Sequence, residues 1–412
     1  MTTNPSPAFP AGEMNPPPDR TSPLTRNRAV LGIASASLLS DAGHEMATAV
    51  LPGFLRSLGA PALALGAIEA AADAAQSFSK LAGGVVVDRA SERRRVATAG
   101  YLVTGLGTGG FALAGPWPVV MMFRAFAWSA RGFRAPARDS LLAGAVSAPQ
   151  RGRAFGLERA GDSVGAVIGP LLAALLLGIV GFRGIFLLSI IPGLLAAAAI
   201  WRLVKETPRV PARAAGLGFR ALPGGAFRRL AVGYGLYGLG SFAPTLLVLR
   251  ATDLLRPGRT LTAAAALSVL LYTVHNAANA LAAYPAGAAA DRVGHRTVLA
   301  TGVALFGLAC IGFALWEPRS FTVLAVLFAV VGTSTAMVET ARGAYVAELV
   351  DAAIQGRAYG LLGLIDGLGD LIANLAVGLL FTVTSAGWGF AWGAVFSLGG
   401  AAVLSVRPRT TR

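Results

Sequence analysis

The amino-acid sequence predicts an all-α polytopic membrane protein in which twelve transmembrane helices form two pseudo-symmetric six-helix bundles. Of its 412 residues, 55% are hydrophobic and 13% are charged, which is far too apolar for an ordinary soluble domain. Apolar runs of roughly 18 to 27 residues recur along the chain, and each is long enough to cross a bilayer. The second half also repeats the first, because residues 152–157 (GRAFGL) return as residues 356–361 (GRAYGL). Such repetition indicates a duplicated membrane fold.

The apolar runs give the spans in order. Residues 1–28 are rich in Pro, Thr and Asn and lack an early hydrophobic core, so we expect a disordered cytoplasmic tail and no signal peptide. The first bundle is predicted over residues 29–204, with spans at about 29–54, 62–87, 96–115, 118–146, 154–180 and 184–204. A polar, Arg-rich central cytoplasmic loop is expected over 205–229. The second bundle, 230–406, holds spans at about 230–252, 261–290, 297–316, 320–346, 357–383 and 387–406, followed by a cytoplasmic tail at 407–412.

The basic residues predict the orientation of the chain. The net charge is +15, and the arginines gather in alternate loops between the apolar spans. This distribution is the positive-inside pattern and argues against a nucleic-acid-binding surface. It places both termini and the central loop in the cytoplasm, in agreement with an even number of spans. A composition rich in Ala, Gly and Arg, with two Lys, is typical of a GC-rich bacterial genome, so we expect the inner membrane.

Titratable residues recur inside the predicted spans. They stand at helical spacing: Asp41, His44 and Glu45 in the first span, Glu69 and Asp73 in the second, and Asp366 and Asp370 in the eleventh. A charge at a helix centre costs about 2.5–3.5 kcal/mol on insertion scales, so several exposed to lipid would rival the stability of a domain. These side chains must therefore line an aqueous cavity or pair with one another. The pattern favours a transporter over an inert scaffold.

The loop between the second and third spans contains Gly84, Asp88, Arg89 and Arg93, and the corresponding loop of the second half contains Gly287, Asp291 and Arg292. These residues match the motif G-x-x-x-D-R-x-G-R-R, and with it the sequence resembles the major facilitator superfamily over essentially the whole chain after residue 28. The resemblance implies a twelve-span fold in two halves. It also implies that Asp88 and Arg89 belong to a charged latch that closes the cytoplasmic side. The alternative is a solvated charge pair in a loop.

A glycine stripe in the fifth span looks like the family's antiporter motif, G-x-x-x-G-P. It consists of Gly161, Gly165, Gly169 and Pro170. Glycines at four-residue spacing let two helices approach closely, and the proline frees backbone groups locally. In the family, this motif is associated with exporters that exchange substrate for protons. The alternative is close helix packing alone.

Arg124 stands where the family places an arginine that helps proton coupling, although Trp128 and Ala130 replace the glycines that follow it. Desolvation favours the protonated form of a carboxylate, whereas a nearby arginine favours the charged form. A cavity that opens alternately to each side changes both effects. We therefore expect Asp41 or Glu45 to carry the coupling proton, with Arg124 as a modulator. The rival interpretation is that acid–arginine pairs only hold helices together.

These observations predict a secondary active transporter of a small organic solute, working by alternating access and proton-coupled efflux. The alternatives are a facilitator or proton symporter that imports a metabolite or ion and, less favoured, a non-transport sensor. No nucleophile–base pair, Walker motif or cysteine pair supports an enzyme, a cofactor or a metal site. The expected partners are the solute, protons and the lipid bilayer, with no nucleic acid, and the expected state is a monomer. Acids in the first two spans favour cationic or neutral solutes, while the fourth-span arginines favour the opposite charge.

Overall fold

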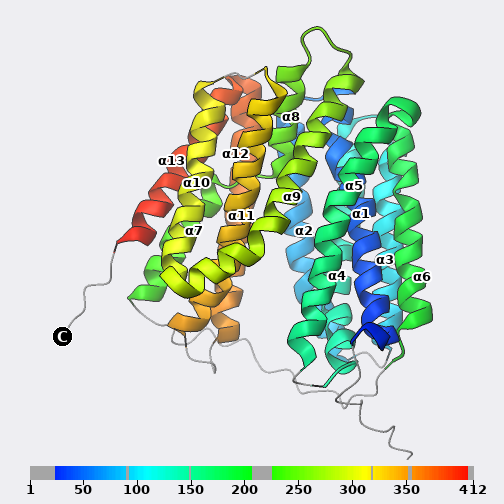
Figure 1. The fold of residues 1–412 in the computed structure, drawn as a ribbon. Coiled ribbons are helices and arrows are strands. Elements are labelled where there is room, and N and C mark those ends of the chain that lie inside the picture. Colours follow the sequence, from blue (N-terminus) through cyan, green and yellow to red (C-terminus); the bar gives the residue numbers. More distant parts are fainter. Residues whose placement is uncertain are drawn as a thin grey trace, which may run out of the picture.

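The computed structural model describes residues 24–89, 92–147, 150–206, 225–316, 319–350 and 355–406. Within these ranges the chain is helical and contains no strand, as the all-α prediction requires (Figure 1). The N-terminal tail as far as residue 23, most of the central loop and the tail at 407–412 lie outside these ranges. The sequence-based expectations for those segments stay predictions.

The first bundle contains six spans and begins after a short 3-10 turn at Leu24–Arg26. Its helices are α1 (Arg28–Ser57), α2 (Ala62–Arg89), α3 (Arg93–Gly109, continued by η2 at Gly110–Leu113), α4 (Trp117–Gly144), α5 (Arg151–Leu188) and α6 (Ile190–Leu203). The long α5 contains the fifth span and the start of the sixth. It turns back at Gly181, whose φ of 67° lies in the left-handed region that favours glycine.

The second bundle follows the same plan with one interruption. Its helices are α7 (Ala226–Gly240), α8 (Pro244–Leu255), α9 (Leu261–Val293), α10 (His295–Leu315), α11 (Phe321–Leu349), α12 (Gln355–Val383) and α13 (Ala386–Ser405). The seventh span, which the sequence predicts as one helix, is broken at residues 241–243 between α7 and α8. Pro244 is the first residue of α8 and has no amide hydrogen, so it cannot extend the hydrogen-bond ladder of α7.

Eight segments of the described chain are long and apolar enough to cross a membrane, and one of them, Arg151–Leu203, contains two spans. These segments account for nine of the twelve predicted spans. The other three are α1, α2 and α4, which are long enough but carry acids and arginines in their middle turns. The helices with most charge are therefore those expected to face an aqueous path.

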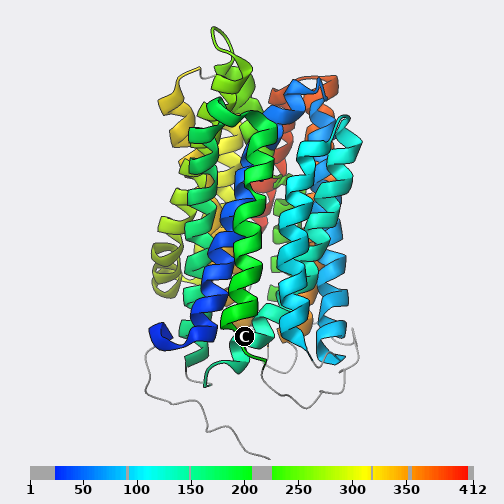
Figure 2. The same ribbon diagram turned by 90° about the vertical axis from the view of Figure 1, so that its right-hand side faces the viewer.

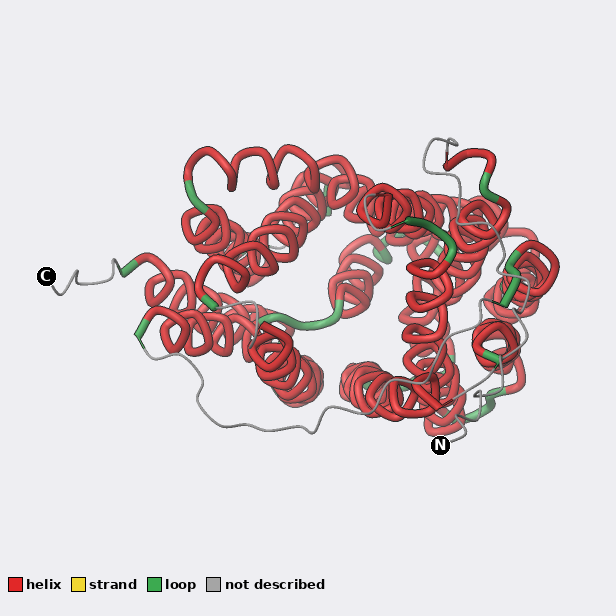
Figure 3. Tube along the Cα trace, turned by 90° about the horizontal axis from the view of Figure 1, so that it is seen from below, coloured by secondary structure: helices red, strands yellow, loops and turns green. Residues whose placement is uncertain are grey.

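The two bundles use the same helix pairings. In the first, α1 packs on α5 and α6, α2 on α4, and α3 on α4 and α6. In the second, the corresponding pairs are α7 with α12 and α13, α9 with α11, and α10 with α11 and α13. Between the bundles, α5 packs on α9 and α12 packs on α2. In both contacts the fifth span of one bundle packs on the second span of the other. Figure 3 looks along the helices and shows the two groups side by side. This arrangement confirms the predicted pseudo-symmetry.

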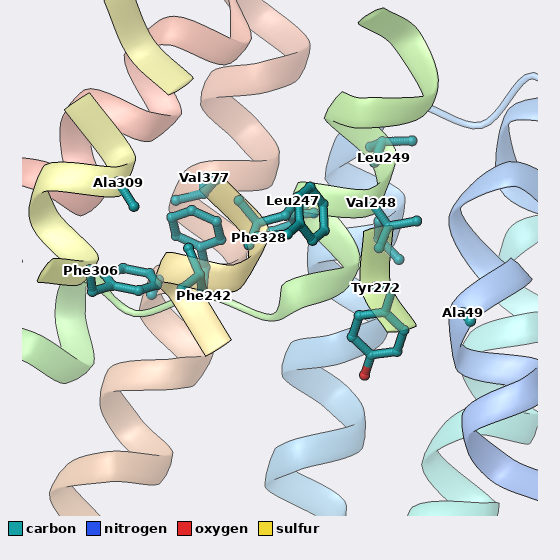
Figure 4. Close-up of a cluster of buried hydrophobic side chains, with 14 of the residues drawn as sticks. Ala49, Phe242, Leu247, Val248, Leu249, Tyr272, Phe306, Ala309, Phe328 and Val377 are labelled. Atoms are coloured by element: carbon teal, nitrogen blue, oxygen red, sulfur yellow. The ribbon is translucent and has the colours of Figure 1, made fainter. Parts of the chain in front are cut away.

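We call the end of the molecule where α1 begins and α13 ends the terminal face, and the opposite end the far face (Figures 1 and 2). Toward the far face the bundles share one hydrophobic core. Leu247 and Val248 of α8 and Tyr272 of α9 lie between Ala49 of α1 and Phe328 of α11 (Figure 4). The two bundles are therefore held together in this half of the molecule by buried apolar surface.

The bundles separate toward the terminal face. In the far half, Gly66 of α2 lies so close to α12 that an added Cβ would overlap the carbonyl group of Asn374. In the terminal half, a Cβ at Gly84 of α2, or at Gly360 and Gly363 of α12, would meet nothing within 4 Å. The same two helices thus touch at one end and have open space beside them at the other. The structure is closed at the far face and open toward the terminal face.

Candidate functional site

Two cavities lie between the bundles. The central cavity, of about 350 Å³, is lined by α1, α2, α4, α9, α12 and the break in the seventh span. Its acidic and basic residues are Glu45, Glu69, Asp73, Asp370, Arg124, Arg131 and His44. The second cavity, which we call the vestibule, has a volume of about 640 Å³ and is lined by the terminal halves of α5, α9 and α11 with parts of α1 and α4. The two cavities form successive parts of a polar region between the bundles.

The predicted acid–histidine group of the first span is assembled as one cluster. Asp41 Oδ1 lies 3.4 Å from His44 Nδ1, and Glu45 Oε1 lies 3.1 Å from His44 Nε2. Arg131 of α4 places Nη2 3.2 Å from Asp41 Oδ1 and also contacts the imidazole ring. The edge of that ring packs against Trp128, with ring centroids 5.5 Å apart. The i, i+3, i+4 spacing on α1 is what brings the three side chains to one face.

Glu45 lies at the division between the two cavities. Glu45 and Arg131 both line the central cavity and the vestibule, whereas Asp41 lines only the vestibule and His44 only the central cavity. Glu45 Oε2 accepts a hydrogen bond of 2.9 Å from the Tyr272 hydroxyl of α9. Since α1 and α9 belong to different bundles, this carboxylate also forms part of the contact between them.

Arg124 is paired with the second span. Its guanidinium is 2% exposed and donates to both carboxylate oxygens of Glu69, at 2.8 and 3.1 Å, and to the Thr48 hydroxyl at 2.7 Å. It also stacks on Trp128, 3.5 Å from the ring centroid. Glu69 accepts a further hydrogen bond of 3.1 Å from Thr245, at the start of α8. The expected modulator of Asp41 and Glu45 thus neutralises Glu69, and Arg131 makes the contact with Asp41.

Asp73 lies one turn after Glu69 and has different partners. Asn374 Nδ2 of α12 lies 3.4 Å from Asp73 Oδ2, while Asn374 Oδ1 accepts a 2.7 Å hydrogen bond from the Ala243 amide. Asn374 therefore links α2 to the interrupted backbone of the seventh span. An unwound stretch at membrane depth is stable where it lines a cavity and its backbone groups find partners, and residues 241–243 meet both conditions.

The two acids of the eleventh span have separate environments. Asp366 lies within 2.9 Å of Arg342 Nη1 and accepts a 2.5 Å hydrogen bond from Tyr234, so it is neutralised within the second bundle. It lines neither cavity. Asp370, one turn further along α12, lines the central cavity, and no ion pair to it exists among the described residues.

The glycine stripe of the fifth span holds α5 against the helix that carries the acid–histidine cluster. A Cβ on Gly161 would lie 2.6 Å from the Ala34 carbonyl oxygen, and Cβ atoms on Gly165 and Gly169 would overlap the carbonyl oxygens of Leu38 and Ala42. All three contacts are with α1. The stripe is thus the packing surface that fixes the position of α1 beside the two cavities.

The residues of the predicted gate lie at the terminal face. Gly84 is in the last turns of α2, and the side chains of Asp88 and Arg89 lie outside the described residues. Arg93 is buried, with Nη1 2.6 Å from Ser140 Oγ and Nε 3.4 Å from Glu206. In the second half, the exposed Asp291 lies 3.4 Å from His295, and Arg292 is exposed beside it, while Gly287 packs near Thr340. Arg93 thus contacts α4 and the start of the central loop, while Gly287 and Asp291 contact residues of the second bundle.

Several cavity residues were not among the predicted site residues. They are Tyr272 and Asn374, which connect the bundles, Arg131, which contacts the acid–histidine cluster, and Thr245 at the start of α8. Arg131 carries a sequence signal, because it stands seven residues after Arg124 and hence on the same stripe of the helix. Within the described chain, no group of three or more His, Cys, Asp or Glu side chains is arranged to hold a metal ion.

The site combines neutralised and free charges at mid-membrane depth. Arg124 and Arg131 are in contact with Glu69 and Asp41, so the positive charges of the central cavity are matched. Glu45, Asp73 and Asp370 have no arginine or lysine within ion-pair distance among the described residues. Such a site can exchange protons or bind a positively charged group, because a lone carboxylate in a low-dielectric region is costly.

Comparison with known proteins places these features in context. The sequence profile of the Major Facilitator Superfamily matches residues 33–268 and 227–412. An uncharacterized MFS-type transporter of Methanocaldococcus jannaschii is 26% identical over 369 residues, which covers 88% of this chain and 90% of that protein. The crystal structure of the nucleoside transporter NupG has a TM-score of 0.74 at 14% identity, covering 92% of this chain and 100% of that one. A bacterial homologue of the human lysosomal transporter Spinster has a TM-score of 0.69 at 16% identity, with coverages of 93% and 95%. The solved structures share the fold.

Proposed function

Because this chain belongs to the Major Facilitator Superfamily of membrane transporters, we propose that it exports a small organic solute in exchange for protons. The terminal face lies in the cytoplasm in this proposal, and the membrane is the bacterial inner membrane. The cytoplasmic assignment follows from the positive charge of the loops on that side. The solute enters the central cavity through the vestibule and leaves through the far face after the bundles have rocked against each other.

The observation that carries the proposal is the position of Glu45. This carboxylate borders both cavities, contacts His44 within its own helix and accepts a hydrogen bond from Tyr272 of the opposite bundle. Protonation converts a charged acceptor into a neutral one and weakens its hydrogen bonds. A proton on Glu45 therefore loosens a contact between the bundles, which is the coupling that alternating access requires.

Asp41 and His44 form a short proton path beside Glu45. His44 lies within 3.4 Å of both carboxylates, so a proton can pass between Asp41 and Glu45 through the imidazole. Asp41 borders the vestibule, and Glu45 reaches the central cavity. The cluster thus connects the side that is open to the terminal face with the site where the solute is held.

The glycine stripe supports the export direction. The stripe resembles a motif that the family's antiporters carry. In this chain it packs directly on α1 between Ala34 and Ala42. The acid–histidine cluster begins at the end of that contact. A shift of α5 therefore moves the proton-binding residues, and a shift of α1 caused by protonation moves α5.

The experiment that tests the proposal measures proton movement in proteoliposomes that contain the full chain and a pH-sensitive dye. A panel of organic compounds is added under a pH gradient, first with the unchanged protein and then with Asp41→Asn and Glu45→Gln. We expect compound-driven proton flux, its loss in Glu45→Gln, and at least a tenfold reduction in Asp41→Asn. Glu348→Gln, an acid exposed at the terminal face, serves as the matched control with normal flux.

The result also decides between export and its alternatives. Protons and solute moving in opposite directions support an antiporter, whereas movement in the same direction indicates a symporter. Undiminished coupling in both Asp41→Asn and Glu45→Gln would exclude the cluster as the proton site. Solute movement that ignores the pH gradient would identify a facilitator.

A further inference from the structure

The central cavity holds more acidic than basic side chains. Arg124 donates to both oxygens of Glu69 and is thereby neutralised. Arg131 is occupied by Asp41 and the His44 ring. Asp73 and Asp370 remain, and among the described residues neither has a cation within ion-pair distance, while Asn374 gives Asp73 one long hydrogen bond. Since Glu45 has His44 beside it, Asp73 and Asp370 are the two carboxyl groups of the cavity that are left, within the described chain, without a basic partner.

The two carboxylates come from different bundles. Asp73 is in the middle of α2, Asp370 is in the middle of α12, and both line the same cavity. These two helices pack on each other between the cavity and the far face, where Gly66 meets Asn374. A ligand that contacts both carboxylates therefore bridges the bundles next to the contact that closes the far face.

Two further features of the cavity favour positive charge. Helix α7 ends at Gly240, and residues 241–243 continue from it along the cavity wall, so the partial negative charge of that helix end lies beside the cavity. At the start of α8 the Thr245 hydroxyl donates to Glu69, so a carboxylate already lies beside the positive end of that helix. The aromatic rings of Phe242 and Tyr272 form other parts of the wall, and such rings attract cations through their faces.

We propose that the transported solute is an organic cation, an ammonium or a similar group with apolar substituents, held between Asp73 and Asp370. A volume of about 350 Å³ lies in the range of small-molecule sites. An anion of the same shape is excluded because both cavity arginines already have carboxylate partners. This inference rests on the proposed function only in that it takes the central cavity as the solute site.

The test compares charge at constant shape. Isothermal titration calorimetry on the full chain in detergent measures binding of tetraphenylphosphonium and of tetraphenylborate, a cation and an anion of the same geometry. Phenyltrimethylammonium and benzenesulfonate form a second, smaller pair. We expect at least one of the cations to bind at least tenfold more tightly than its anionic counterpart. Asp73→Asn and Asp370→Asn should each weaken that binding at least tenfold, while Asp370→Glu, which keeps the charge, should retain most of it.

Glu92→Gln is the matched control, because Glu92 is an exposed acid outside the cavity and its loss should leave cation binding unchanged. Tighter binding of the anions, no binding of either cation, or unchanged cation binding in both Asn variants would overturn the inference. The two acids lie in different bundles, so failure of one variant to fold leaves the other informative. Calorimetry needs no pH gradient, so it tests the solute class independently of proton coupling. If the cations bind but drive no proton flux in proteoliposomes, the antiport proposal is contradicted and the proposed solute class still stands.

Discussion

Arg56 and Asp253 form a two-pronged ion pair that joins the bundles near the far face. Arg56 Nη2 lies 2.6 Å from Asp253 Oδ2, and Nε lies 3.1 Å from Oδ1. Arg56 is in the last turn of α1 and Asp253 is near the end of α8, so the pair closes the side of the molecule opposite the vestibule. Both side chains are about one-third exposed, which makes the pair accessible to water when the bundles part.

The first prediction concerns this far-face pair. Arg56→Ala should shift the transporter toward the state that is open at the far face, because the bidentate pair exists only while that face is closed. The shift is measured in cells with a membrane-impermeant thiol reagent that reaches a Thr245→Cys reporter in the central cavity. Cys310, the single native cysteine, is 1% exposed and gives a low background.

The matched control is Arg256→Ala, which removes an exposed arginine on the same face. We expect reporter labelling to be several-fold faster in Arg56→Ala and unchanged in Arg256→Ala. The exchanged variant Arg56→Asp with Asp253→Arg should return labelling toward the original rate. Equal labelling rates in all variants would show that the pair does not hold the face closed.

A second prediction tests the glycine stripe. Gly165→Ala places a methyl group against the Leu38 carbonyl of α1, whereas Gly156→Ala, in the same helix, meets nothing within 4 Å. Overpacking of this kind costs about 1–3 kcal/mol. Gly165→Ala should lower the thermal unfolding midpoint and reduce transport, while Gly156→Ala should do neither. A thermal melt in detergent measures the first effect, and a Gly165→Ala protein with an unchanged midpoint would contradict the packing role.

The helical architecture is predictable from the sequence because the physics is local. A bilayer requires apolar runs of a set length and internal backbone hydrogen bonds, so the runs predict the twelve spans directly. The break in the seventh span escapes this reasoning. Residues 241–243 do not interrupt the apolar run, and a proline such as Pro244 is tolerated in many membrane helices. The hydrogen bond from the Ala243 amide to Asn374, which helps to stabilise the interruption, joins residues far apart in the sequence.

The pairing of charges is less predictable, because a sequence indicates which residues share a helix face and leaves open which neighbour faces them. Arg124 and Arg131 lie on one stripe of α4, yet the first contacts Glu69 of α2 and the second contacts Asp41 of α1. The same limit applies to the eleventh span. Asp366 is neutralised by Arg342 of its own bundle, whereas Asp370 is left in the cavity, a difference set by helix rotation and by neighbours far away in the chain.

A third prediction concerns the buried pair of Arg124 and Glu69. Removing one partner leaves the other charge buried and alone, which costs about 3–5 kcal/mol. Arg124→Gln and Glu69→Gln should each destabilise the protein strongly, and the double variant should lose less than the sum of the two. A double-mutant cycle on thermal unfolding measures the coupling. Arg124→Lys should restore only part of the stability, since Lys lacks the planar group that bonds Thr48 through Nη1 and Glu69 through Nη2 and that stacks on Trp128. Full additivity would show that the pair is not a unit.

A fourth prediction separates coupling from transport. Tyr272→Phe removes the hydroxyl that donates to Glu45 and keeps the ring that lines the central cavity. The carboxylate then no longer links the bundles at the division between the cavities, so protonation loses its effect on their contact. We expect solute movement to persist while the number of protons moved per solute falls, with a proton leak in the absence of solute. The measurement is dye-reported proton flux beside solute flux in the same proteoliposomes. Tyr284→Phe is the control, because that ring is 85% exposed on α9 and its hydroxyl can be removed without touching either cavity. Tight coupling in Tyr272→Phe would mean that Glu45 binds its proton without sensing the second bundle.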